Sequence, residues 1–173
     1  MINKCINIFS FIFYFVLIVS CKNENQKNQQ INEGKYNITL LNDSIRLNEH
    51  LKAIAYIETP FFIDKNVRLI VYLENDENDP LKKDLSNERD IPFDLFISLD
   101  QDEYNQKWFK DYHFETSVVF GKKFSTPGEK TLRGYFLEYY GGNYDPKNDI
   151  VLEDGKMEKK YFEKTIYIKD TIN

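Results

Sequence analysis

Apolar residues recur at every second position through most of the chain after Tyr36, and this period of two limits the possible folds more than any other feature. It is the spacing of a β-strand, whose side chains point alternately to opposite faces. Turn signals rich in Gly, Pro, Asn and Asp separate the strand-like segments. Seven to eight strands are predicted, at 36–41, 44–47, 51–57, 67–73, 93–99, 114–120, 132–140 and 161–168. The chain is therefore predicted to be all-β.

The pattern also predicts faces for some of these strands. Segment 67–73 is apolar at nearly every position, which predicts a central strand buried on both sides. In segment 93–99 we expect Leu95 and Ile97 to face the core, with Phe96 on the opposite face. Only residues 100–112 could hold a short helical turn, and Trp108 in this segment is the expected core anchor.

Strands of this number, joined by loops, favour an antiparallel β-sandwich of the immunoglobulin-like type. Segments 36–41 and 44–47 are expected to pair with each other at an edge. Loop 74–92 is too long for a regular series of hairpins and predicts a Greek-key crossover between sheets. A closed, lipocalin-like barrel is the alternative.

The first 20 residues differ from the rest of the chain. Lys4 is their only charge, and the 14 residues of segment 6–19 are apolar apart from Asn7 and Ser10. This length is typical of the apolar core of a signal peptide and short for a membrane-spanning helix, which needs about 20 residues. Residues 1–20 are therefore predicted to be a signal peptide.

The signal segment is followed by a motif, Ile18-Val19-Ser20-Cys21, that resembles the lipobox of bacterial lipoproteins. The resemblance implies cleavage between Ser20 and Cys21 and attachment of lipid to the Cys21 thiol. Two or more acyl chains anchor a protein stably in a membrane. The protein is thus expected to be exported and lipid-anchored. Lys22, in place of Asp, implies the outer membrane, with the periplasmic and surface faces both open.

Residues 21–35 are predicted to be the lipidated cysteine and a disordered tether, followed by a β-sandwich domain at 36–173. The tether is mostly Asn, Gln, Lys and Glu, and Ile31 is its one large apolar residue, so it cannot form a core. Segment 126–138 has a Pro-Gly turn followed by a strand with an embedded glycine. It is similar to the late hairpin of immunoglobulin-like domains in small bacterial lipoproteins, which implies a fold and no activity. Gly134 itself predicts a bulge or close packing against a bulky neighbour.

Composition excludes some functions. With 23 Lys and Arg against 28 Asp and Glu, the net charge is −5, which argues against a nucleic-acid partner. No catalytic motif stands out, so neither an enzyme nor a cofactor is predicted, and a small hydrolase is the least supported alternative. No metal site is predicted either. The acidic runs give only weak calcium candidates at Asp76, Asp79, Asp100 and Asp102, without the glycine of an EF-hand loop.

Tyrosines cluster late in the chain, and Tyr135, Tyr139, Tyr140 and Tyr144 form a possible binding surface. The leading hypothesis is a non-catalytic module of the cell envelope that binds a protein or has a structural role. One alternative is a glycan-binding accessory domain that uses these tyrosines. Another is an envelope immunity or inhibitor protein that uses the acidic segment 74–79.

Overall fold

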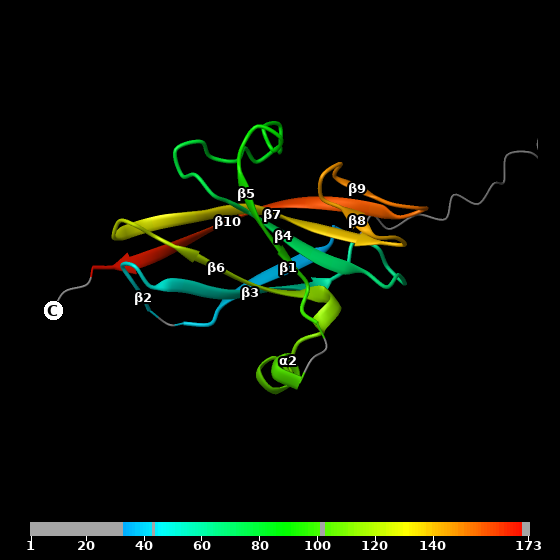
Figure 1. Cartoon of the computed structure of the whole chain (residues 1–173), viewed down its shortest axis with the longest axis horizontal. Coiled ribbons are helices and arrows are strands. Elements are labelled where there is room, and N and C mark those ends of the chain that lie inside the picture. The colour runs from blue at the N-terminus through cyan, green and yellow to red at the C-terminus, as the bar shows by residue number, and fades with distance from the viewer. Residues whose placement is uncertain (1–32, 43, 101–102, 171–173) are drawn as a thin grey trace, which may run out of the picture. The chain divides into compact units, whose positions relative to one another are not determined.

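A computed structural model describes residues 33–42, 44–100 and 103–170, and ten strands lie within these ranges (Figure 1). They are β1 (Lys35–Leu40), β2 (Ile45–Arg46), β3 (His50–Thr59), β4 (Arg68–Glu74), β5 (Phe93–Ile97), β6 (Ser117–Lys123), β7 (Gly128–Tyr140), β8 (Tyr144–Asp145), β9 (Ile150–Val151) and β10 (Lys156–Lys169). A short helix, α2 (Glu103–Trp108), and a 3-10 turn, η1 (Phe114–Thr116), precede β6. The all-β prediction is confirmed, as is the short helical turn.

The strands form two larger sheets and one small hairpin. The order β1-β3-β6 makes a three-stranded antiparallel sheet, and β2-β10-β7-β4-β5 makes a five-stranded sheet in which only β2 runs parallel to its neighbour. β8 and β9 pair with each other. The two larger sheets meet beyond the end of β5, where the Leu99 N–H donates to the Ser117 carbonyl at 3.0 Å. The five-stranded sheet therefore curls toward the three-stranded one.

Side chains of both sheets share one core. Its fully buried members alternate along each strand, as the period of two predicts: Leu51, Ala53 and Ala55 on β3, Val118 on β6, Leu69, Val71 and Leu73 on β4, Leu132 on β7 and Ile168 on β10. β4 is buried on both faces, and its central position is confirmed. At Gly134 of β7, an added Cβ would lie 2.1 Å from the Tyr72 carbonyl oxygen, so the close packing expected there is also confirmed.

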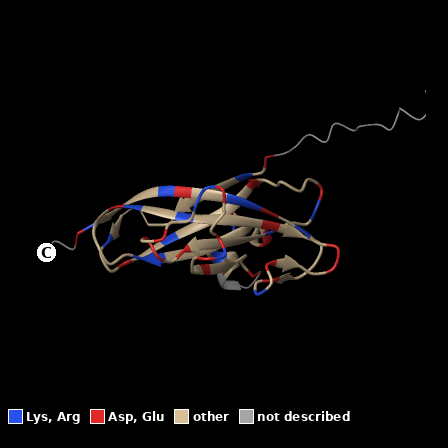
Figure 2. Cartoon of the chain, turned by 90° about the horizontal axis from the view of Figure 1, so that it is seen from above, with Lys and Arg blue, Asp and Glu red and all other residues tan. Residues whose placement is uncertain are grey.

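A second apolar cluster lies on the outer face of the five-stranded sheet. Ile70 and Tyr72 of β4 and Leu137 of β7 pack there against Leu81 and Ile91 of the loop between β4 and β5. We call residues 75–92 the 75–92 loop and residues 144–151, which contain β8 and β9, the 144–151 hairpin. Figure 1 shows both of them on the side of this sheet that faces away from β1 and β3. Acidic and basic residues are interspersed along the strands and loops in Figure 2.

Two predictions about connections are wrong. The 75–92 loop does not cross between sheets, because β4 and β5 are antiparallel neighbours and the loop folds back over their own sheet. β1 and β2 do not pair with each other, because β1 pairs with β3 while β2 joins β10 in the other sheet. Both errors concern which strands meet, which is set by contacts between distant parts of the chain.

The predicted faces of two segments are also wrong. Leu95 and Ile97 are 40% and 62% exposed, whereas Phe96 packs on Phe120 with ring centroids 5.9 Å apart. β5 carries apolar residues on both faces, so alternation could not decide which face lies inward. Trp108 is 62% exposed and is not a core residue. In segment 114–120, the first three residues form η1 and the strand begins at Ser117.

Candidate binding site

The four late tyrosines predicted as a binding surface do not form one exposed row. Tyr135 and Tyr139 are 4% and 8% exposed, and both lie on the outer face of β7. Tyr140 is the next residue along the strand and points to the opposite face, where its ring contacts Phe62 with centroids 4.9 Å apart. Tyr144 of β8 is half-buried over the outer face, with its ring 5.8 Å from that of Tyr139. The structure thus brings three of the four together and separates Tyr140.

Two aromatic residues that the sequence did not single out complete this group. The ring of Tyr72 stacks on that of Tyr135, with centroids 4.6 Å apart and an interplanar angle of 14°. Phe93 contacts both rings edge to face, at 5.9 and 5.4 Å. Tyr72 lies directly opposite Tyr135 in the pairing of β4 with β7. Only the strand register makes these residues neighbours, so no local pattern could reveal the group.

Hydrogen bonds tie the 144–151 hairpin to this face. The hydroxyls of Tyr72 and Tyr144 are 2.6 Å apart, and the Tyr144 hydroxyl donates to Asp149 Oδ1 at 2.7 Å. Burial raises the pKa of Tyr72 and Tyr144, and the hydrogen bonds to Tyr72 and Asp149 raise the pKa of Tyr144 further. Burial likewise raises the pKa of Tyr135. The three phenols therefore stay protonated at neutral pH and can donate hydrogen bonds.

Lys159 of β10 binds both segments that cover the outer face of the five-stranded sheet, the 75–92 loop and the 144–151 hairpin. Its Nζ donates to Asp149 Oδ2 of the hairpin at 2.5 Å and to Glu88 Oε2 of the 75–92 loop at 2.8 Å. The same ammonium lies 5.2 Å from the centroid of the Tyr135 ring, within the range of a cation–π contact. All three charged side chains are at most 23% exposed, so these ion pairs are partly shielded from water.

A cavity of about 510 Å³ lies between the loop and the hairpin. We call it the tyrosine pocket. Its aromatic lining comes from Tyr72, Phe93 and Tyr135, and its polar lining from Glu88, Arg89, Lys147, Asn148 and Asp149. The volume lies within the range of about 300–1,000 Å³ that is typical of small-molecule sites.

The outer edge of the five-stranded sheet is a second candidate surface, which we call the β5 edge (Phe93–Ile97). β5 hydrogen-bonds to β4 on one side only within these residues. The exposed apolar side chains of Leu95 and Ile97 lie on it. Its one charged residue is Asp94, whose Oδ1 accepts from Asn75 Nδ2 at 3.2 Å.

The acidic residues considered as calcium ligands do not come together in the described structure. Asp76 Oδ1 accepts from the backbone and side-chain nitrogens of Asn78, both at 2.8 Å, which closes a turn. Asp79 and Asp100 are exposed, and Asp102 lies outside the described residues. Nowhere in the described ranges do three or more His, Cys, Asp or Glu side chains come together as metal ligands.

Glu74, the first acid of the segment proposed for inhibition, is fully buried. Its Oε2 accepts from the Leu81 N–H at 2.7 Å, and its Oε1 lies 3.6 Å from Arg133 Nη1. Lys122 Nζ donates to the Glu74 carbonyl at 2.6 Å, and burial lowers the pKa of Lys122. Glu74 therefore holds the 75–92 loop in place and presents no charge to a partner.

The predicted signal peptide, the cleavage position at Ser20 and the lipidation position at Cys21 lie outside the described residues. Within the part of the chain that is described, no helix is long and apolar enough to cross a membrane. Comparisons of the chain with protein-family models, with curated proteins and with solved structures find no match.

Proposed function

We propose that this chain is an exported lipoprotein, anchored through lipid on Cys21, whose domain is a non-catalytic module that binds a protein at the cell envelope. The lipobox-like motif supports the anchor, and Lys22 after the cysteine supports an outer-membrane location. The core shared by the two sheets supports an immunoglobulin-like β-sandwich for residues 36–173. The partner proposed is an extended protein segment that adds a strand to the β5 edge.

The direction of the backbone groups along β5 is the observation that carries the proposal. Before the strand, the Pro92 carbonyl accepts from Asn75 on the β4 side, and after it the Leu99 N–H donates to Ser117 on the opposite side. Backbone groups alternate in direction along a strand. The N–H and C=O groups of Phe93, Leu95 and Ile97 therefore point away from β4, toward the open edge.

The side chains of β5 also suit a partner strand. Natural edge strands are usually protected by charges, above all by lysine. Among the described residues, β10 pairs with β2 only through its last two residues and is otherwise open on that side, and it carries five lysines in its 14 residues. β5 carries only Asp94 and exposes Leu95 and Ile97. In strand addition, main-chain hydrogen bonds supply affinity and alternate side chains supply specificity, and both are present here.

The test is co-purification from the native envelope with the full anchored chain. We expect Leu95→Lys and Ile97→Lys to reduce recovery of a specific partner at least tenfold, because each places a charge in the apolar contact. Thr165→Lys, a matched change on the exposed part of β10, should leave recovery unchanged.

Amide hydrogen exchange on the purified pair then tests the geometry. The partner should protect the N–H groups of Leu95 and Ile97. Equal recovery with all three variants, or unchanged exchange at both amides, would disprove the proposed site. Concentration-dependent dimerisation of the purified chain that is abolished by Leu95→Lys would show a second copy to be the occupant and would equally overturn the proposal of a different partner.

A further inference from the structure

We infer that the tyrosine pocket binds the carboxylate end of an acidic sugar. This site shares Phe93 with the β5 edge but otherwise consists of other residues, and its ligand is distinct from the protein segment proposed there. Three features of the described residues point to it: a phenol hydroxyl without a hydrogen-bond partner, two cations without an ion-pair partner and an aromatic lining.

The phenol is that of Tyr135. Only 4% of the surface of Tyr135 is exposed. A buried tyrosine hydroxyl ordinarily has a hydrogen-bond partner. Its hydroxyl forms no hydrogen bond with any residue that the structure describes. Among the described residues, only two fully buried side-chain oxygen or nitrogen atoms have no hydrogen-bond partner, and they are Glu74 Oε1 and Ser117 Oγ. The Tyr135 hydroxyl is not one of them, so it is accessible from the pocket. Tyr135 therefore offers a protonated hydroxyl to the pocket that it lines.

The cations are Arg89, on the 75–92 loop, and Lys147, on the 144–151 hairpin. Both are exposed at the pocket that they line, and neither side chain forms an ion pair or hydrogen bond to another described residue. The nearby acids, Glu88 and Asp149, are already paired with Lys159. The lining itself carries two positive and two negative side chains, and Lys159, which pairs with both acids, adds a third positive charge beside it. A guanidinium can hold a carboxylate through two parallel hydrogen bonds, and the ammonium and the phenol add further donors.

The remaining lining suits a sugar ring better than a bare anion. Phe93 is half-buried and presents an apolar surface beside the cations. Asn148 uses its Nδ2 to donate to Asp145 Oδ2 at 2.8 Å, which leaves its amide oxygen available to accept from a ligand hydroxyl. An inorganic anion would use the cations alone, whereas a sugar acid would use the aromatic and amide groups as well.

The test is titration calorimetry on the full chain in detergent with glucuronate, glucose and sulfate as separate probes. We expect millimolar or tighter binding of glucuronate, with glucose and sulfate at least tenfold weaker. Arg89→Gln and Lys147→Gln should each weaken glucuronate binding about tenfold, which corresponds to about 1.4 kcal/mol. Tyr135→Phe keeps the stacked ring and should weaken binding severalfold, with melting temperature measured to confirm that each variant is folded.

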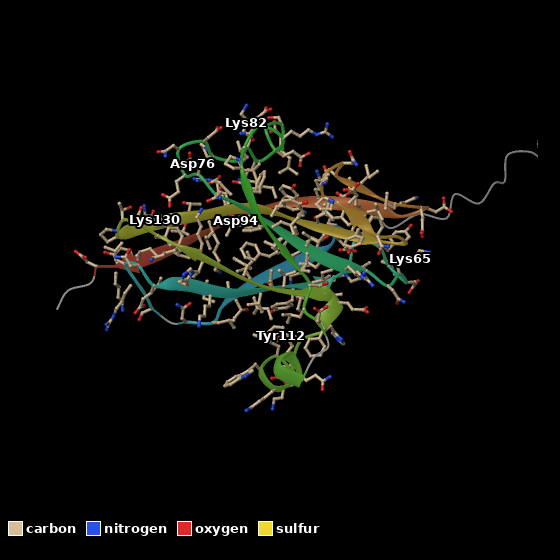
Figure 3. The ribbon with its side chains drawn as sticks, viewed as in Figure 1. Lys65, Asp76, Lys82, Asp94, Tyr112 and Lys130 are labelled. Carbon is tan, nitrogen blue, oxygen red and sulfur yellow. The ribbon has the colours of Figure 1, made fainter. Side chains whose placement is uncertain are left out.

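Two controls make the result specific. Lys82 lies on the outermost part of the 75–92 loop, away from the sheet, so Lys82→Gln changes the same charge on the same loop and should leave binding unchanged (Figure 3). Ile97→Lys changes the β5 edge at a position opposite Ile70, outside the pocket lining, and should also leave glucuronate binding unchanged, so failure of one site is distinguishable from failure of the other. Absence of glucuronate binding, equal binding of glucose, equal binding of sulfate, or equal weakening by Lys82→Gln would overturn the inference.

Discussion

Glu138 shows what a single residue can do without any signal in its local sequence. It is fully buried on the core-facing side of β7, in a run of apolar and aromatic neighbours. Its carboxylate accepts from the backbone N–H groups of Phe61 and Phe62, both at 3.0 Å, and from the Tyr36 hydroxyl at 2.8 Å. Three donors from distant segments satisfy the buried charge, so it is tolerated in the core. The sequence of segment 132–140 predicted a strand but contained no signal for a buried carboxylate at this position.

Buried phenols make the stability of the fold depend on pH in the alkaline range. Burial raises the pKa of Tyr36 and Tyr135 above the ordinary value, so above about pH 10 the unfolded chain binds fewer protons than the folded one. The free energy of unfolding should be insensitive to these groups below about pH 10 and should fall above it. Tyr135 alone should contribute a decrease of up to about 1.4 kcal/mol per pH unit.

Urea denaturation of the wild type and of Tyr135→Phe at about pH 8 and about pH 11 measures this contribution. The wild type should lose more stability than the variant between the two conditions. Lys122 acts in the opposite direction, because its lowered pKa makes the unfolded chain the better proton binder below about pH 10.5, but it is present in both proteins and cancels in the comparison. Identical pH dependence of the two proteins would contradict the expected role of Tyr135.

At the scale of elements, strands were predictable and their partners were not. β4, β7 and β10 have long apolar or alternating sequences, and the structure contains strands at all three predicted positions. Pairing depends instead on contacts between residues far apart in the chain, and nothing local in the sequence encodes them. The same limit applies to the tyrosine pocket, since Tyr135 and Tyr144 could be singled out by tyrosine density, whereas Tyr72 and Phe93 join them only through the register of β4 with its neighbours.

The pairing of β4 with β7 depends on the absence of a side chain at Gly134. A methyl group there would lie 2.1 Å from the Tyr72 carbonyl oxygen and 2.8 Å from the Phe162 ring. The backbone of a central strand cannot move aside without breaking its hydrogen bonds to the neighbouring strands. Gly134→Ala should therefore lower the free energy of unfolding by about 2–4 kcal/mol. Chemical denaturation measures the loss. Glu129→Ala, at an exposed position of the same strand, should change stability by no more than about 0.5 kcal/mol, and equal stability of both variants would show that the contact is not tight.

At the scale of the whole molecule, the lipid anchor is the proposal on which location depends. Metabolic labelling with palmitate in the native cell tests it directly. The wild type should take up label and remain with the membrane fraction, because in the proposed maturation a diacylglycerol that carries the acyl chains is joined to the Cys21 sulfur by a thioether. Cys21→Ala should take up no label and should retain its leader.

The chain supplies its own control for that experiment. Cys5 lies in the predicted leader, so Cys5→Ala removes the other thiol and should leave labelling and membrane association unchanged. Label in Cys21→Ala, or none in the wild type, would refute lipidation at this cysteine.

The position of Lys159 has a consequence for the mobility of the two segments that cover the five-stranded sheet, the 75–92 loop and the 144–151 hairpin. One ammonium is shared by Glu88 in the loop and Asp149 in the hairpin, so loss of the Lys159 charge would leave both carboxylates without their cation. The two segments are therefore energetically coupled although 71 and 10 residues separate their acids from Lys159 along the chain. Replacement of Lys159 should therefore increase the mobility of both segments at once, whereas replacement of Glu88 alone should leave Asp149 paired with Lys159.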